Sequence, residues 1–280
     1  MDVSAFLDRA EDLFAGDPYE GALADPAHAE LVREVAGMTT ARQVAVLNLA
    51  ARLLPPDECY LEVGTFKGRS ICGATRGVEG GCFVAIENFV EFGMSGREAR
   101  AELEANLSRH CAGKDVRVVE GDAFAVLRSG HAVDRPVGVY FYDGEHTGLS
   151  HYLALGVVEP LLADEALVLV DDATWPLVQR AHARFLATHP GWTVVRRWDA
   201  RVNDDPEWAN GLHALRFSRG PRARAPDPRV RFALVVQRGI VGPARRTVWR
   251  VLARAPWLVP LAKRLEPKSG HTIGADAGPP

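Results

Sequence analysis

The fold of this 280-residue chain is decided by the stretch Leu61-Glu62-Val63-Gly64-Thr65-Phe66-Lys67-Gly68-Arg69-Ser70. An apolar run at 60–63 predicts a buried strand, the glycines predict a tight turn, and residues 69–76 predict a helix. In such a unit, backbone N–H groups point at a ligand above the helix N-terminus. The spacing G-x-x-x-G differs from the G-x-G-x-x-G of dinucleotide sites, and the acid before the turn suits a positive or hydroxyl-rich ligand.

Further apolar runs follow this unit, and polar helical segments separate them. The alternation predicts an α/β fold with a Rossmann-like, doubly wound sheet of seven strands. We expect the sheet to be mostly parallel, with an antiparallel last strand and helices on both faces. The expected strands are 59–63, 82–87, 115–119, 137–142 and 166–171, then a pair at 192–198 and 212–217, and the expected helices are 41–54, 69–76, 96–112, 148–162 and 176–188.

The sequence predicts three parts along the chain. Residues 1–57 form an N-terminal helical cap, in which Thr39 or Thr40 caps the helix at 41–54. Residues 58–218 hold the sheet and its ligand site. Residues 219–280 form a tail rich in proline and arginine, with a linker at 218–228 and an amphipathic helix near 243–255.

The charge is distributed unevenly along the chain. The net charge is −3, but residues 1–218 hold 20 Lys+Arg and 33 Asp+Glu, a net of −13, whereas residues 219–280 hold 13 and 3, a net of +10. An acidic body argues against a nucleic-acid substrate, because phosphate contacts need a basic face. The four cysteines form no C-x-x-C pair, and neither a signal peptide nor a membrane-spanning run is recognisable. We therefore expect reduced thiols and a cytoplasmic protein.

Acidic residues follow every expected parallel strand. Because the carboxyl ends of parallel strands meet at one edge of a sheet, these side chains are expected to face one ligand site. The strand-end groups are Glu62, Glu87-Asn88, Asp122-Ala123, Asp143 to His146 and Asp171-Asp172.

Three of these acids have a ligand interpretation and a structural one. Glu87 either accepts hydrogen bonds from both ribose hydroxyls of a nucleotide or is a solvated turn residue. Asp122 either lies beside an adenine ring, with Ala123 as a packing neighbour, or caps the next helix, and both roles are compatible. Glu62 either faces the ligand or only braces the glycine turn.

The acids after the fourth and fifth strands suggest a cation site. Asp143, Asp171 and Asp172 at close range would repel one another, and a hard divalent ion such as Mg²⁺ would relieve that repulsion. Alternation in an extended strand sends Asp171 and Asp172 to opposite faces, so they share a metal only if the chain is already turning. The alternative is one metal ligand and one helix-capping acid.

His146 is the candidate proton acceptor. The unperturbed pKa of histidine lies near 6.5, and a base of this strength suits removal of a hydroxyl proton. Asp143 is a second candidate for that role. The alternative for His146 is a surface histidine after a turn, and His151 is a weaker candidate on the following helix.

Together the segments 61–70, 84–88, 120–124, 142–146 and 168–172 resemble class I S-adenosylmethionine (SAM)-dependent methyltransferases. They are more narrowly similar to the branch of cephalosporin-hydroxylase-like and macrocin-type O-methyltransferases, which have a D-G-D-H-type fourth strand and a D-D fifth strand. This chain departs from that branch at Glu145, where Asp is usual, and at 163–166, where Pro-Gly-Gly is usual. The resemblance implies SAM bound by Glu62, Gly64, Gly68, Glu87 and Asp122, with Thr65, Ser70, Asn88 and Ala123 beside them, and Mg²⁺ near Asp143, Asp171 and Asp172.

The expected function is therefore methyl transfer from SAM to a hydroxyl of a small molecule, such as a sugar or a natural product, assisted by Mg²⁺. The alternatives are a non-catalytic SAM-binding protein and a nicotinamide-dependent oxidoreductase. The glycine spacing counts against the oxidoreductase.

The tail poses a separate question. In the helix at 243–255, Arg246, Arg250 and Arg254 share one face, and Val248, Val251 and Leu252 share the other. The tail is expected to contact an anionic membrane peripherally, the protein's own acidic body, or a second subunit.

Overall fold

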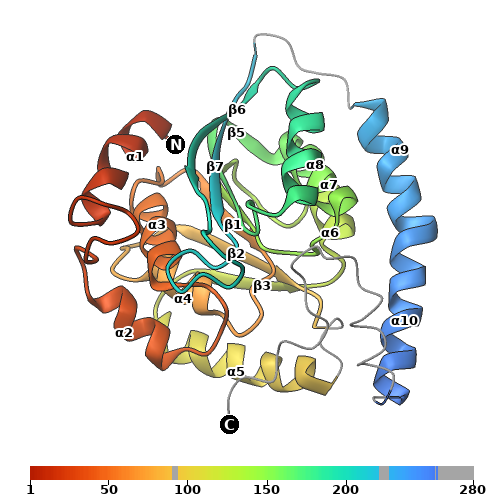
Figure 1. The fold of residues 1–280 in the computed structure, drawn as a ribbon, viewed down its shortest axis with the longest axis horizontal. Helices are drawn as coiled ribbons and strands as arrows, with labels where there is room; N and C mark the ends of the chain where they lie inside the picture. Colours follow the sequence, from red (N-terminus) through yellow and green to blue (C-terminus); the bar gives the residue numbers. More distant parts are fainter. Residues whose placement is uncertain (90–93, 221–226, 256, 258–280) are drawn as a thin grey trace.

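A seven-stranded sheet forms the centre of the protein (Figure 1). The computed structural model describes residues 1–89, 94–220, 227–255 and 257. The strand order is β3-β2-β1-β4-β5-β7-β6, and β7 alone runs in the opposite direction to the other six strands. The predicted fold class is confirmed. The strands are β1 Cys59–Val63, β2 Cys82–Glu87, β3 Val116–Glu120, β4 Val137–Tyr142, β5 Leu162–Val170, β6 Trp192–Trp198 and β7 Leu212–Ser218.

The central strands are buried on both faces, which explains their continuous apolar runs. Every residue of β1, β2 and β4 is buried. β1 pairs with β2 on one side and with β4 on the other. The strand order therefore reverses beside β1, and the glycine turn leaves the sheet at this switch point, where open α/β sheets bind their ligands.

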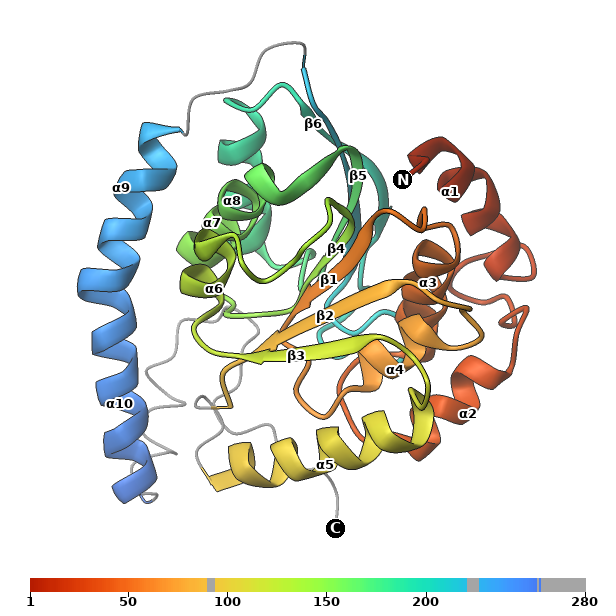
Figure 2. The ribbon, with the colours of Figure 1, turned by 180° about the vertical axis from the view of Figure 1, so that it is seen from behind.

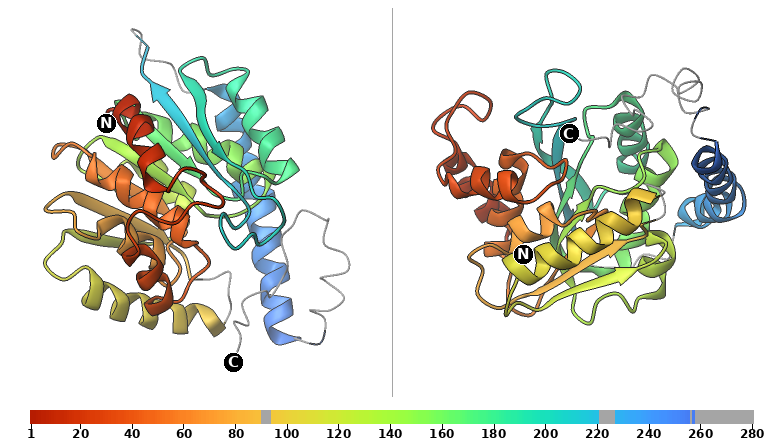
Figure 3. Two further views of the ribbon diagram at one scale, coloured as in Figure 1. Left: turned by 60° about the vertical axis from the view of Figure 1, so that its left-hand side comes forward. Right: turned by 90° about the horizontal axis from the view of Figure 1, so that it is seen from below.

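Helices cover both faces of the sheet (Figures 2 and 3). One apolar core joins the sheet to α1, α3 and α4, and the other joins it to α6, α7, α8 and α9. The helices are α1 Val3–Ala10, α2 Ala27–Glu34, α3 Ala41–Arg52, α4 Arg69–Thr75, α5 Met94–His110, α6 Ala123–Ser129, α7 Gly148–Val158, α8 Pro176–Leu186, α9 Pro228–Val236 and α10 Gly242–Arg254, with short helical turns at Glu11–Leu13, Glu159–Leu161 and Gln237–Val241.

The N-terminal segment packs against the sheet through α1 and α3. Thr40 caps α3 in a reciprocal capping box with Gln43, because each side chain bonds the backbone N–H of the other. Apolar α3 residues such as Val44 and Leu47 are buried in the same core as Tyr60 of β1. Residues 1–57 thus supply part of the layer that covers one face.

Two helices were not expected from the sequence. α6 has only seven residues, too few to show a helical period, and it begins at the Asp122 cap. α9 begins at Pro228, the last residue of the expected linker, whereas no helix was expected before residue 243. Asp227 accepts a hydrogen bond from the Arg229 N–H, and Pro228 occupies the first helical position, which is a helix-start signal.

α9 continues through a π-helical turn, Gln237–Val241, into α10. The expected helix at 243–255 is therefore the second half of a longer one. The side chains of Arg246, Arg250 and Leu252 lie outside the described part of the structure. None of the described helices is both long enough and apolar enough to cross a membrane.

Candidate active site

The carboxyl ends of the parallel strands bring the predicted acids to one edge. The Gly64 N–H donates to the Ile86 carbonyl at 3.0 Å, and the Asp143 N–H donates to the Val63 carbonyl at 2.9 Å. The Asp171 N–H donates to the Tyr142 carbonyl at 3.0 Å. The chain segments that leave neighbouring strands therefore lie side by side, as the parallel topology requires.

The glycine turn is fitted tightly between neighbouring elements. Gly64 and Gly68 have φ angles of +91° and +89°, a region that favours glycine. A Cβ on Gly64 would lie 1.9 Å from the Asp143 carbonyl oxygen, and one on Gly68 would lie 2.6 Å from the Leu103 Cδ1. Both positions require glycine. At Gly64, the missing side chain lets the turn pack directly against the end of β4.

Glu62 is fully buried behind this turn. Its carboxylate accepts hydrogen bonds from the Tyr60 hydroxyl at 3.0 Å and the Ser70 hydroxyl at 2.9 Å. Burial raises the pKa of Glu62 to about 7, against a usual value of 4.5. These contacts support the interpretation of Glu62 as a brace that ties β1 to the first turn of α4. The hydroxyl of Ser70 is part of this brace.

We expect Glu62→Gln to change how stability depends on pH. The folded state binds the Glu62 proton more tightly than the unfolded state does, so this group's stabilising contribution is complete below about pH 4.5 and is lost as the pH rises to about 7. The free energy of unfolding of the wild type should therefore fall relative to the variant across this window, by at most about 3 kcal/mol. Urea titrations at several pH values measure the difference. A difference that does not change with pH would contradict the raised pKa.

Glu87 ties the end of β2 to the glycine turn. Its Oε2 accepts from the Phe66 N–H at 2.8 Å, and its Oε1 accepts from the N–H groups of Asn88 at 2.7 Å and Phe89 at 3.1 Å. Only 7% of the residue is exposed, which argues against a solvated turn acid. Its role at ribose hydroxyls stays a prediction.

The remaining predicted cofactor residues border the same edge. Asp122 is exposed and caps α6, because it accepts a hydrogen bond from the Ala125 N–H at 2.9 Å. Ala123 is the first residue of that helix, and Thr65 is buried within the glycine turn. The capping role of Asp122 is thus observed, and its contact with an adenine ring stays a prediction.

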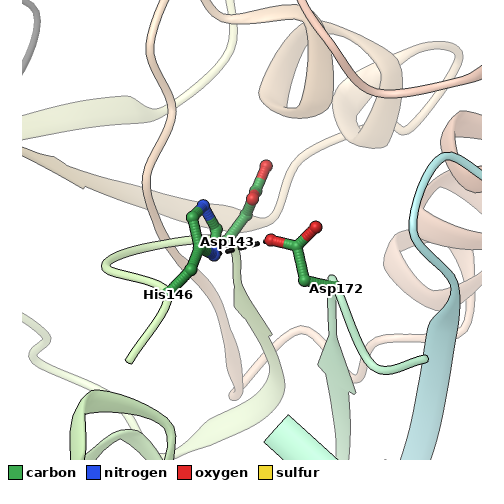
Figure 4. Close-up of side chains that lie close together, drawn as sticks. All are labelled: Asp143, His146 and Asp172. Carbon is green, nitrogen blue, oxygen red and sulfur yellow. Dashed lines mark ion pairs between the residues drawn. The ribbon is translucent and has the colours of Figure 1, made fainter. Parts of the chain in front are cut away.

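Asp143, His146 and Asp172 form a compact group (Figure 4). Each offers one ligand atom, and these atoms lie within 4.8 Å of one another. The His146 Nδ1 lies 2.6 Å from the Asp172 Oδ2. Burial raises the pKa of Asp143 well above its usual range, and the charges of Asp171 and Asp172 raise it further. Such crowding of carboxylates favours a bound cation or a bound proton.

Asp171 differs from the expected metal set, and His146 takes its place in the compact group. The Asp171 Oδ1 accepts from the Gln43 Nε2 at 2.7 Å and from the Asp172 N–H at 2.9 Å, so it faces α3. Asp172 has a φ of +53°, so the chain turns sharply between the two acids. Burial, followed by the charge of Asp172, raises the pKa of Asp171 to about 8.

Several side chains around this group were not singled out from the sequence. Gln43 holds Asp171, and Asn210 donates to the Asp172 Oδ1 at 2.8 Å. Trp175 packs edge-to-face on His146, with ring centroids 5.6 Å apart. In the sequence, Gln43 is recognisable only as part of a helix cap, and Asn210 lies in a polar loop. Neither pattern predicts a residue of the site.

His151 lies behind His146, with ring centroids 6.1 Å apart. It is buried, and burial followed by the nearby His182 lowers its pKa well below the usual value. A neutral, enclosed imidazole makes His151 less suited than His146 to reach an acceptor.

Comparison with known proteins agrees with this architecture. Residues 61–173 match the family model of a methyltransferase domain. Among solved structures, cofactor-bound Rv0187 from MTB is 23% identical with a TM-score of 0.53 and covers 78% of this chain and 96% of its own. The O-methyltransferase TomG from Streptomyces achromogenes, in complex with SAM, is 20% identical with a TM-score of 0.50 over 78% and 96%. An O-methyltransferase from Bacillus cereus, in complex with SAH, is 16% identical with a TM-score of 0.53 over 76% and 97%.

A search of curated proteins finds no match to this sequence. The methyltransferase domain that residues 61–173 match and the glycine turn at the switch point of the sheet agree with the predicted resemblance to class I SAM-dependent methyltransferases. The narrower resemblance to macrocin-type enzymes stays a prediction.

Proposed function

We propose that this chain transfers the methyl group of SAM to a hydroxyl of a small molecule, such as a sugar or a natural product. The observation that carries the proposal is the grouping of Asp143, His146 and Asp172 beside the glycine turn. Gly64 lies in contact distance of the Asp143 backbone, so the expected nucleotide site and the acidic group adjoin. Transfer to a hydroxyl requires a proton acceptor held next to the methyl donor.

The turn and the ends of β1 to β3 form the proposed cofactor site. The Glu87 Oε2 accepts one hydrogen bond from the described residues, and a carboxylate oxygen has room for a further donor such as a ribose hydroxyl. SAM supplies a methyl group on a sulfonium sulfur, whose positive charge suits this acidic edge. The residues of the proposed site are Gly64, Thr65, Gly68, Glu87, Asn88, Asp122 and Ala123, with Glu62 and Ser70 bracing the turn behind them.

His146 is the proposed base. Its Nδ1 lies 2.6 Å from the Asp172 Oδ2, and a proton that this carboxylate keeps on Nδ1 would make Nε2 the nitrogen that accepts the proton of the acceptor. Nε2 would take the proton of the acceptor hydroxyl, and bound SAM would supply its methyl group to that oxygen and leave as S-adenosylhomocysteine. Asp172 then stabilises the imidazolium, and Asn210 holds Asp172 in place.

The same residues fit a divalent cation. Two carboxylates and one imidazole offer ligand atoms within 4.8 Å, and the carboxylates are crowded enough to raise the pKa of Asp143. Oxygen-rich sets of this kind suit Mg²⁺ or Mn²⁺, and the imidazole favours the transition metal. A bound cation lowers the pKa of a hydroxyl that it contacts. Asp143 and Asp172 are the proposed carboxylate ligands, with His146 as the third side chain.

The acceptor side of this group borders the loop at 199–211. Asn210 of this loop bonds Asp172, and Trp208 is buried against Phe14 with ring centroids 5.6 Å apart. Arg42 of α3 forms an ion pair with Glu207. We propose that the N-terminal segment and this loop together enclose the acceptor and exclude water.

Removal of metal ions tests the cation. We expect dialysis against EDTA to lower methyl transfer at least tenfold and added Mg²⁺ or Mn²⁺ to restore it, because the carboxylates lose their counter-charge. The measurement is transfer of tritium from methyl-labelled SAM to a panel of glycosides and phenolic natural products. SAM affinity in the same buffers should not change, which controls for loss of the fold.

Unchanged turnover in metal-free buffer would contradict the role of the cation. His146, held by Asp172, would then be a base that works without a metal. The short His146–Asp172 contact supports that second mechanism. In that case His146→Ala should still abolish transfer.

A further inference from the structure

The C-terminal helix has an inner face packed on the body and an outer face with exposed apolar side chains. Val230, Ala233 and Leu234 are buried where α9 packs against the outer side of α7. On the opposite side of the same helix, Phe232 is 70% exposed and Val235 is 68% exposed. Since the inner face already provides the contact with the body, folding of the chain does not account for the outer apolar residues.

The exposed apolar positions continue along the whole helical segment. Ile240 in the π-helical turn is 66% exposed, and Val248 and Val251 of α10 are about half exposed. Trp257 follows with 76% exposed. Figures 1 and 2 show α9 and α10 in one line along one side of the body. Single exposed apolar residues are ordinary, but a row of them along one helix indicates an interaction surface.

The charge of this helix has one sign. Between Pro228 and Ala255 the sequence contains no Asp, Glu or Lys. Among the ion pairs between described residues, none includes Arg229, Arg231 or Arg238, and all three are exposed. The arginines of this segment are Arg229, Arg231, Arg238, Arg245, Arg246, Arg250 and Arg254.

A groove of about 1320 Å³ runs beside α9. Its lining combines apolar side chains, such as Leu127 and Val157, with more cationic than acidic ones: Arg128, Arg219, Arg229, Arg231 and Arg238 against Glu159 and Asp227. A groove that combines apolar side chains with an excess of arginines suits an amphiphile that carries a negative headgroup.

We propose that the outer face of this helix, residues 228–254, docks on an anionic lipid bilayer. An interfacial helix combines apolar residues that enter the acyl region with arginines that contact acidic headgroups, and this segment presents both. A second copy of the chain fits less well, because a symmetric contact would place two helices of the same positive sign together. The groove would receive parts of individual lipids.

The docking helix also contacts the loop that holds His146. The buried Gln237 donates a hydrogen bond from its Nε2 to the Glu145 Oε2 at 2.8 Å. Docking through the outer face would leave this contact in place. Docking would therefore hold a helix that is bonded directly to the loop of His146 at the lipid surface.

Co-sedimentation of the full-length protein with vesicles tests the proposal. We expect binding to vesicles that contain phosphatidylglycerol, much weaker binding to phosphatidylcholine alone, and loss of binding at high salt. Phe232→Ser with Val235→Ser, and separately Arg229→Glu with Arg231→Glu, should each weaken binding about tenfold or more. Val202→Ser and Arg109→Glu change an exposed valine and an exposed arginine elsewhere on the body and should have no effect.

Two outcomes would overturn the proposal. The first is no binding of the wild type to phosphatidylglycerol vesicles, or equal binding by the charge-reversed variant. The second is a dimer in sedimentation velocity that Phe232→Ser with Val235→Ser dissociates, in a protein that ignores vesicles, because the face would then be an interface between copies. Circular dichroism melts confirm that each variant is folded.

Discussion

Replacement of Asp143 by Asn is expected to lower methyl transfer by at least about a hundredfold and to raise the melting temperature. The activity falls because the group formed by Asp143, His146 and Asp172 loses one negative charge. That charge either binds the cation or favours removal of the proton from the acceptor hydroxyl. The melting temperature rises because burial and the neighbouring Asp171 and Asp172 make the charged form of Asp143 unfavourable. Tritium transfer from SAM and thermal denaturation measure the two effects.

A matched control for this variant is Asp57→Asn, which removes an exposed carboxylate away from the site and should change neither quantity. A decrease in transfer of less than tenfold in Asp143→Asn would contradict the role of Asp143. A lower melting temperature would contradict the crowding of the carboxylates.

Gly64→Ala is expected to lower the free energy of unfolding by more than about 3 kcal/mol and to abolish SAM binding. The φ of +91° strains any side chain, and the new Cβ would lie 1.9 Å from the Asp143 carbonyl oxygen. Because that atom belongs to the backbone, the end of β4 or the whole turn has to move. Urea denaturation measures the stability, and calorimetry measures the binding.

Gly80→Ala separates the two causes. Gly80 has a φ of +72°, but a Cβ there would meet no atom within 4 Å. Only the backbone strain remains, which should cost about 1–2 kcal/mol and leave SAM binding intact. Equal losses in the two variants would show that the close approach to Asp143 is unimportant.

The sheet could be predicted because its signals are local. Continuous apolar runs mark strands that are buried on both faces, and the alternation with helices implies parallel pairing. β1, β2 and β4 have the predicted bounds, whereas β5 begins four residues earlier than expected, at Leu162. The polar Asp164 and Glu165 interrupt the apolar pattern there, although both lie within β5 and Glu165 pairs with Ser218 of β7.

The helices that were missed lack such signals. α6 is too short to display a period, and α9 lies in a segment whose proline and arginine content is typical of a linker. Its inner face becomes recognisable only when α7 lies against it. Tertiary packing therefore decides a helix that local composition does not.

The sequence predicted that the acids after the strands gather at one edge, and the structure brings Asp143, His146 and Asp172 together there, while their ligand roles stay predictions. Topology alone places Asp143 and Asp172 at one edge. Asp172, and not Asp171, joins the compact group for two reasons. The backbone of Asp172 is left-handed, and Asp171 is held by Gln43, which is 128 residues away from it in the sequence. No local pattern encodes that contact, so the exchange of Asp171 for His146 appears only in the folded chain.

The central claim is that a SAM site around Gly64 and Glu87 adjoins a separate acidic group. Isothermal titration of SAM into the wild type and Asp143→Asn tests it most directly. We predict one bound SAM per chain in both proteins, with affinities that agree within about threefold. The absence of heat with SAM in the wild type, or loss of binding in Asp143→Asn alone, would contradict the account.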